Sequence, residues 1–144
     1  MNTKPAKNIL AGWLQFTQWH YSVSSLLEQA LSDKHGLSLK EFYMLYFLYE
    51  APERKLRLQE LESMVGLSQS AMSRLVSRFE ARACGAMQRH HCDADRRGVY
   101  TCLTDAGREK VEQALDTVLH VLGTEWTAND MARLARLMPP GQVE

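Results

Sequence analysis

The chain has 144 residues, of which 45% are hydrophobic and 24% charged, and its 17 Lys and Arg residues balance its 17 Asp and Glu residues. This length allows one domain of ordinary size, and the composition excludes a disordered or collagen-like chain. The longest apolar run, Phe42–Tyr49, has eight residues and is too short for a membrane span. Because no N-terminal signal segment is visible either, we expect a cytoplasmic protein that does not enter the membrane.

Two helices are predicted at the start of the chain. Apolar residues recur at helical spacing over residues 8–34, and Gly36 follows as a helix stop. Ser38 and Glu41 then form the pattern of a capping box, in which each side chain binds the other residue's backbone N–H. The second helix is predicted to run from this box to about Glu50.

A helix-turn-helix is predicted next. A polar loop over residues 51–55 leads into a short third helix, which starts near Arg57 without a good capping residue and ends at Gly66. Ser68 can cap a fourth helix, which Gly85 ends. The third and fourth helices are therefore joined by only two or three residues.

A β-hairpin follows the fourth helix. Residues 86–91 and 99–103 are predicted as short strands, joined by a long polar loop over residues 92–98. This order of elements is that of a winged helix-turn-helix. In such a lobe the last helix fits the major groove of DNA, and the hairpin reaches phosphates or the next minor groove.

Two more helices are predicted after the hairpin. Thr104 can cap a fifth helix, which we expect Gly123 to break. Thr127 and Asp130 form a second capping box, which opens a last helix to about Leu137. The predicted fold is therefore mainly α-helical with a small β-hairpin.

The fourth helix has two faces of opposite character. Its apolar face, predicted to join the core, consists of Met72, Leu75, Val76 and Phe79. Its opposite face consists of Ser70, Arg74, Ser77 and Ala81. Small side chains permit close approach to DNA, arginine can bind guanine through two hydrogen bonds, and Gln69 can bind adenine.

The basic residues of this neutral chain are concentrated in its middle. Residues 68–102 hold six arginines against three acidic residues. Neighbouring arginines at the predicted hairpin tip suit a narrow minor groove, and Asp95 can fix the rotamer of Arg97. The predicted partner is double-stranded DNA, and its predicted contacts are Ser68, Gln69, Ser70, Ser73, Arg74, Ser77, Arg78, Arg89, Asp95, Arg96 and Arg97.

From about Leu37 to Gly107 the sequence resembles the MarR family of bacterial transcription regulators. The matching segments are Leu67–Ser70, Leu75–Glu80, Gly85–Arg89, Asp95–Gly98 and Leu103–Gly107. Family members usually carry a larger aliphatic residue in place of Ala86, so we expect looser packing at the base of the hairpin.

The resemblance implies a homodimer formed by the first, fifth and sixth helices, which presents two recognition helices to a palindromic operator. It also implies a repressor that a small-molecule effector or thiol oxidation releases from DNA. We therefore expect one domain over residues 1–144, with dimerisation helices in 8–36 and 104–138 and a DNA-binding lobe in 37–103. The aromatic first helix supports a dimer independently, because a monomer of this size could not easily bury all of it.

The effector site follows from the resemblance as well. Effectors in this family commonly sit where the dimerisation helices meet the DNA-binding lobe. Residues that could line such a pocket for a small aromatic or amphipathic effector are Trp13, Phe16, Trp19, His20, Tyr43, Tyr46 and Phe47. Aromatic residues at helical spacing also fit a plain core or a dimer interface.

Other functions have weaker support in the residues. A thiol switch could use Cys84, Cys92 or Cys102, although Cys84 lies at the negative end of a helix, which raises a thiol pKa. A metal site at His90 and Cys92 offers two ligands where zinc needs three or four, so no metal or cofactor is expected. The motifs of phosphate-binding loops, zinc proteases and serine hydrolases are absent, which argues against an enzyme. A winged helix that binds protein fits a basic, Ser-rich helix poorly.

Overall fold

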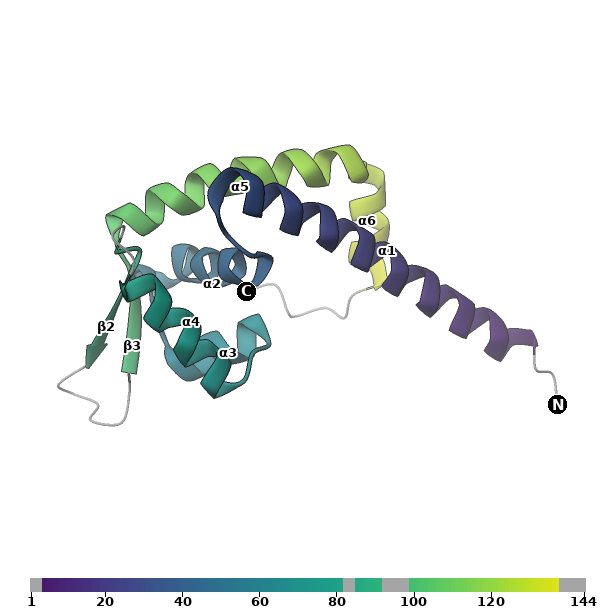
Figure 1. Ribbon diagram of the computed structural model, residues 1–144. Helices are drawn as coiled ribbons and strands as arrows, with labels where there is room; N and C mark the ends of the chain where they lie inside the picture. Colours follow the sequence, from purple (N-terminus) through teal and green to yellow (C-terminus); the bar gives the residue numbers. More distant parts are fainter. Residues whose placement is uncertain (1–3, 82–84, 92–98, 138–144) are drawn as a thin grey trace.

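The computed structural model describes residues 4–81, 85–91 and 99–137 (Figure 1). The elements in chain order are α1 (Lys4–His35), α2 (Leu39–Glu50), a 3-10 turn (Pro52–Arg54), β1 (Lys55–Arg57), α3 (Leu58–Val65), α4 (Gln69–Ala81), β2 (Met87–His91), β3 (Val99–Leu103), α5 (Asp105–Glu125) and α6 (Ala128–Leu137). The prediction of a mainly helical winged helix-turn-helix is confirmed.

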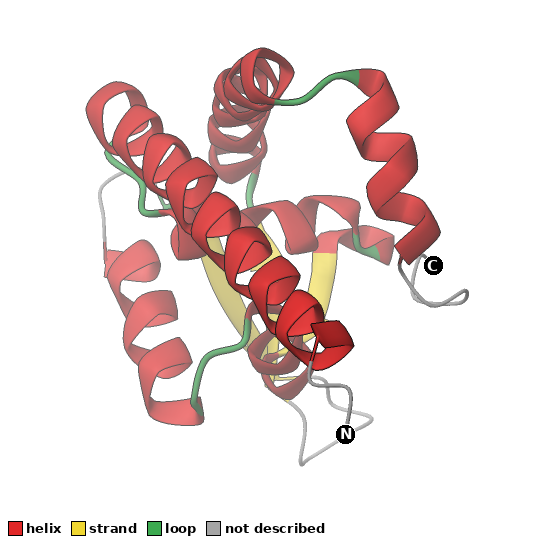
Figure 2. Ribbon diagram, turned by 90° about the vertical axis from the view of Figure 1, so that its right-hand side faces the viewer, coloured by secondary structure: helices red, strands yellow, loops and turns green. Residues whose placement is uncertain are grey.

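Two long helices, α1 and α5, lie against each other and cover the lobe that contains α2, α3, α4 and the sheet (Figures 1 and 2). The first half of α1 projects beyond the rest of the chain, and α6 descends from the far end of α5 (Figure 1). The projecting half of α1 is thus left without a covering layer in the single chain.

The sheet has three antiparallel strands in the order β1-β3-β2. Lys55 of β1 lies opposite Cys102, and Arg57 lies opposite Tyr100. The prediction of a polar loop over residues 51–55 was therefore wrong at its end, because Lys55 opens a strand. Strand β1 is short and forms by pairing with a partner far along the sequence, so local periodicity gave no signal for it.

The core lies between α1, α5 and the lobe. Its largest fully buried side chains include Leu31 of α1, Leu48 of α2, Leu61 of α3, Phe79 of α4 and Val111 of α5. Every described helix except α6 contributes buried apolar residues to this one cluster. The helix-turn-helix lobe is therefore packed directly on α1 and α5.

Most helix signals in the sequence are confirmed, whereas the predicted end of the fourth helix at Gly85 follows residues 82–84, which lie outside the described residues. Ser38 Oγ accepts the Glu41 amide at 3.1 Å, and Glu41 Oε1 accepts the Ser38 amide at 3.0 Å, which completes the capping box. Gly66 ends α3 in the left-handed conformation, with φ of 79°. The expected break at Gly123 was wrong: α5 continues to Glu125, because this glycine lies exposed on the helix surface and its cost of about 1 kcal/mol is tolerated.

The base of the hairpin is joined to the start of α5 by close backbone contacts. Thr104 Oγ1 donates to the Gly85 carbonyl at 2.6 Å and accepts the Gly107 amide at 3.1 Å. The Thr104 amide donates to the Ala86 carbonyl at 3.1 Å. A Cβ atom on Gly107 would lie 2.7 Å from Leu103 Cδ1 and closer still to the Ala86 oxygen. The expectation of loose packing here was wrong, because Gly107 lets α5 approach and bury the small Ala86.

Candidate nucleic-acid interface

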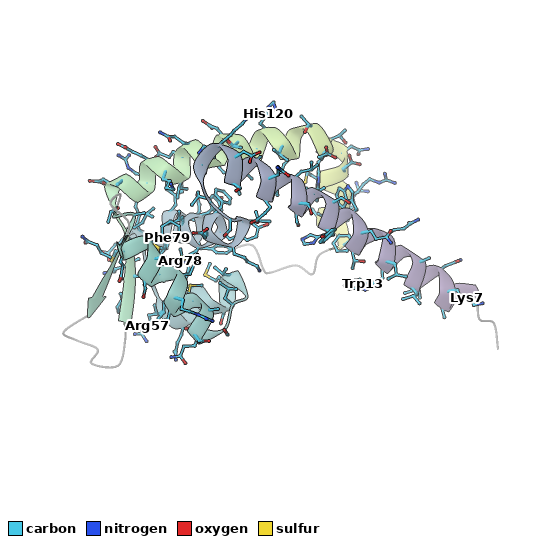
Figure 3. All side chains as sticks on the ribbon, in the orientation of Figure 1. Lys7, Trp13, Arg57, Arg78, Phe79 and His120 are labelled. Atoms are coloured by element: carbon cyan, nitrogen blue, oxygen red, sulfur yellow. The ribbon has the colours of Figure 1, made fainter. Side chains whose placement is uncertain are left out.

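Helix α4 separates its core residues from its polar residues as its periodicity predicts. Met72, Val76 and Phe79 are fully buried, and Leu75 is nearly so. Figure 3 shows the neighbours Phe79 and Arg78 on this helix, of which Phe79 is buried and Arg78 exposed. The buried face fixes the rotation of α4, so its other face is held toward solvent.

The predicted contact residues at the start of α4 are exposed together. Ser68 Oγ accepts the Ala71 amide at 3.3 Å and lies 3.4 Å from Ser70 Oγ. Gln69 and Ser70 are exposed in the first turn, where backbone N–H groups favour an anion. Arg74 Nε donates to the Ser70 carbonyl at 3.3 Å, which ties the arginine to its own helix.

An open groove of about 700 Å³ runs along this face of α4. It is lined by Ser38, Lys40, Leu67, Ala71, Ser73, Arg74, Leu75, Ser77 and Arg78. Three of these side chains are cationic, so the groove favours a negatively charged ligand such as a phosphate backbone. Sequence reasoning missed Ser38 and Lys40, because only the folded chain brings the start of α2 beside α4.

Lys40 also holds the helix-turn-helix in place. Its Nζ donates to the Val65 carbonyl at 2.9 Å, at the last residue of α3. A cation is favourable at a helix C-terminus, where carbonyl groups lack partners within the helix. Lys40 therefore connects the start of α2 to the turn that sets the angle of α4.

The predicted hairpin contacts are placed only in part. Arg89 lies in β2, opposite Thr101 of β3. Asp95, Arg96 and Arg97 lie outside the described residues. The strands that lead to them are present, so the hairpin stands beside α4 as the winged helix-turn-helix prediction requires (Figure 1).

The aromatic residues predicted for an effector pocket fall into separate groups. On α1, Trp13, Phe16 and His20 are exposed and their rings follow one another, with centroid distances of 6.1 Å and 6.3 Å. Trp13 is 60% exposed and lies on the projecting half of α1 (Figure 3). Trp19 instead stacks on Trp126, with a centroid distance of 4.2 Å.

The aromatic residues of α2 form the other group. Tyr43, Tyr46 and Phe47 are half-buried and pack against the core. Burial raises the pKa of the Tyr43 hydroxyl. The ring contacts of this group with described residues stay within α2, so the single chain does not join it to the rings of Trp13 and Phe16.

The structure places only some of the residues considered for a thiol switch or a metal site. Cys102 is half-buried, and burial raises the pKa of its thiol, which lowers the fraction of reactive thiolate. Cys84 and Cys92 lie outside the described residues, so one half of the possible His90–Cys92 pair is not placed. Within the described ranges, no three His, Cys, Asp or Glu side chains converge as metal ligands.

Comparison with known proteins matches this lobe to one family. The family model of the MarR family matches residues 35–98, from the end of α1 through the hairpin. A search of curated proteins found no match. None of the described helices is long and apolar enough to cross a membrane.

Several solved structures share the fold along nearly the whole chain. Sco3205 of Streptomyces coelicolor, a MarR family transcriptional regulator solved in complex with DNA, is 26% identical with a TM-score of 0.76, and the match covers 92% of this chain and 84% of that one. A mutant MarR from E. coli, solved with operator DNA, is 22% identical with a TM-score of 0.71, covering 90% and 92%. BpsR of Bordetella bronchiseptica, described as regulated by 6-hydroxynicotinic acid, is 20% identical with a TM-score of 0.73, covering 89% and 95%. At these last two identities the likeness concerns the fold alone.

The fold and the polar face of α4 define a winged helix-turn-helix protein of MarR type. The family model, which matches residues 35–98, and the similar structures confirm the resemblance of this chain to the MarR family of transcription regulators.

Proposed function

We propose that the protein is a dimeric repressor that binds a palindromic DNA operator and is released by a small-molecule effector. The observation that carries this proposal is the exposed, small and basic face of α4 beside the hairpin. DNA bound to Sco3205 and to the E. coli MarR mutant supports it by analogy. Residues 1–144 then act as one unit, with dimerisation helices in 8–36 and 104–138 and the DNA-binding lobe in 37–103.

The dimer is argued from exposed apolar surface at both ends of the chain. Large apolar side chains that stand exposed on α1, α5 and α6 are Ile9, Leu10, Trp13, Leu14, Phe16, Tyr21, Leu26, Leu119, Met131 and Leu137. A surface of this kind marks an interaction site in a folded protein. A symmetric pair of chains would cover it and place two α4 helices about 34 Å apart, one turn of DNA.

DNA recognition would divide between two sets of side chains. The exposed face of α4 would read base edges in the major groove, chiefly through Gln69, Ser70 and Arg74. The hairpin residues Arg89, Asp95, Arg96 and Arg97 would contact phosphates or the minor groove. Lys40 and the serines of the groove would add phosphate contacts beside α4.

The effector pocket would form at the dimer interface from Trp13, Phe16, Trp19, His20, Tyr43 and Phe47, since the single chain keeps the two aromatic groups apart. Such a pocket suits an aromatic acid. BpsR, which is described as regulated by 6-hydroxynicotinic acid, supports this class of effector by analogy. The raised pKa of Cys102 makes a thiol switch at that residue the weaker alternative.

DNA binding is tested by selecting bound sequences from a random duplex pool and measuring affinity by fluorescence anisotropy. The pool should yield a palindrome, with half-sites spaced by one helical turn. Arg74→Ala and Arg97→Ala should each weaken binding by about 1–3 kcal/mol, and Arg74→Ala should also relax sequence preference. Arg136→Ala, an exposed change on α6, is the control for the loss of one arginine; once sedimentation velocity shows that it assembles as the wild type does, it should bind DNA as the wild type does. Wild-type protein that ignores every duplex at low salt would overturn the proposal.

The dimer and the effector are tested separately. Trp13→Glu should turn a dimer into monomers in sedimentation velocity, because it places a charge in the proposed interface. Small aromatic acids should release operator DNA, whereas peroxide should act no differently on a variant without its three cysteines. A wild-type protein that is monomeric in solution would refute the proposed dimer. Release of operator DNA by peroxide that requires a cysteine would favour the thiol switch.

A further inference from the structure

An arginine and a tyrosine are joined across the strand pair that the sequence did not predict. Arg57 ends β1 and lies opposite Tyr100 of β3. Its Nε donates to the Tyr100 hydroxyl oxygen at 3.0 Å, and its guanidinium carbon lies 5.5 Å from the centre of the Tyr100 ring. Both contacts restrict the rotamers of a long exposed side chain, so the guanidinium is held in a defined position.

A second cation shares the same ring. Lys55 Nζ lies 5.8 Å from the centre of the Tyr100 ring and 2.6 Å from Glu53 Oε2. The Glu53 carboxylate therefore offsets the charge of Lys55. A second acidic side chain in contact with this segment is Glu60, whose Oε2 accepts the backbone amide of Arg57 at 3.3 Å.

The position of Arg57 links the helix-turn-helix to the hairpin. Arg57 directly precedes α3, and its partner Tyr100 is the second residue of β3. Figure 3 shows Arg57 at the end of the sheet, beside the helices α3 and α4. A ligand that spans α4 and the hairpin would pass close to this corner of the lobe.

The geometry points to Arg57 as a further DNA-binding residue, which binds a backbone phosphate between the grooves occupied by α4 and the hairpin, with Tyr100 as its positioning residue. This inference rests on the proposed DNA-binding function. Arginine binds phosphate through two parallel hydrogen bonds, and an arginine already held by a ring loses less freedom on binding. Phosphate contacts fix the register of a protein on the duplex and carry no direct sequence information.

The test measures the salt dependence of binding by the full-length protein to its selected operator and to an unrelated duplex. Arg57→Gln should weaken both complexes by a similar factor, on the order of tenfold. The slope of log affinity against log salt should become shallower by about 0.9 for each phosphate that the variant no longer binds. Tyr100→Phe keeps the aromatic ring and leaves the Arg57 charge in place but removes the hydroxyl that accepts from Arg57, so we expect a smaller reduction in affinity of about threefold.

Arg136→Gln is the control for the loss of one exposed positive charge outside the helix-turn-helix lobe, and because α6 belongs to the proposed dimerisation region, sedimentation velocity first establishes that this variant assembles as the wild type does. An unchanged salt slope for Arg57→Gln would overturn the inference, as would an equal fall in Arg57→Gln and Arg136→Gln. A loss of affinity for the selected operator without a loss for the unrelated duplex would also overturn the inference, because it would indicate that Arg57 recognises bases. Wild-type protein that binds no DNA would refute the proposed function itself, which is a distinct outcome. Circular dichroism of each variant is measured to establish that the substitution leaves the fold intact, because Tyr100 is half-buried.

Discussion

The close contact between α5 and the base of the hairpin predicts opposite effects of alanine at Gly107 and at Gly123, two glycines of α5. Replacing Gly107 with alanine should destabilise the protein, although alanine is normally the better helix former by about 1 kcal/mol. The added Cβ would collide with the Ala86 carbonyl oxygen and with Leu103 Cδ1. Leu103 can rotate away at modest cost. The Ala86 carbonyl cannot move freely, because it accepts the Thr104 amide at 3.1 Å.

The size of the effect follows from these opposing contributions. Overpacking a buried site costs about 1–3 kcal/mol, and the gain in helix propensity offsets up to about 1 kcal/mol of it. We therefore expect Gly107→Ala to lower the free energy of unfolding by about 1–2 kcal/mol. That change corresponds to a fall in Tm of roughly 3–6 °C.

Gly123→Ala is the matched control, because Gly123 lies in the same helix with no described atom within 4 Å of an added Cβ. This change should raise the free energy of unfolding by up to about 1 kcal/mol. Both variants are compared with the wild type by urea and thermal unfolding at one protomer concentration, since a dimer would make stability concentration-dependent. If Gly107→Ala were as stable as Gly123→Ala, the close contact at Ala86 would not exist in solution.

Three further predictions concern residues at contacts between helices. Burial, and secondarily the charges of nearby lysines, lowers the pKa of His35 below its ordinary value of 6.5. The unfolded chain therefore binds the His35 proton more tightly, and the free energy of unfolding should fall as the pH drops below about 6.5. His35→Gln should reduce this pH dependence, measured by urea unfolding at pH values on either side of 6.5. Lys40→Met removes the hydrogen bond to the Val65 carbonyl and should cost about 1 kcal/mol, with faster amide exchange in the turn before α4; unchanged exchange would count against the role of Lys40. Trp126→Ala removes the stack on Trp19 and should destabilise the chain by about 1 kcal/mol or more, with faster proteolysis within α6, whereas Trp126→Phe should retain most of the contact.

Features that depend on neighbouring residues could be predicted from the sequence. The capping box of Ser38 and Glu41 is formed as expected, and so is the box at Thr127, whose amide donates to Asp130 Oδ2 at 2.9 Å. The two faces of α4 followed from its period of 3.6 residues, because burial of Phe79 and its neighbours fixes the rotation of the helix. Local chemistry and local spacing carry the information for these particular features.

Features that depend on distant residues could not be predicted in the same way. Strand β1 exists through its pairing with β3, and its three residues are too few to show a period. Glu53 and Arg54 adopt positive φ angles of 55° and 54°, which no turn motif in the sequence indicates. The groove that brings Lys40 beside α4 arises only when α2 packs on α3 and α4. The groove brings Lys40 into the candidate interface, and the pairing of β1 with β3 brings Arg57 beside Tyr100, so the sequence alone underestimated the charged residues near α4 and the hairpin.

Thr104 serves two elements at once, since its hydroxyl caps the start of α5 and also holds Gly85, two residues before β2. The N-terminal end of α5, a helix of 21 residues, is thus fixed to the base of the hairpin. Because α5 also packs on α1 and α2, we expect a displacement of this helix to move the base of the hairpin together with the core of the lobe.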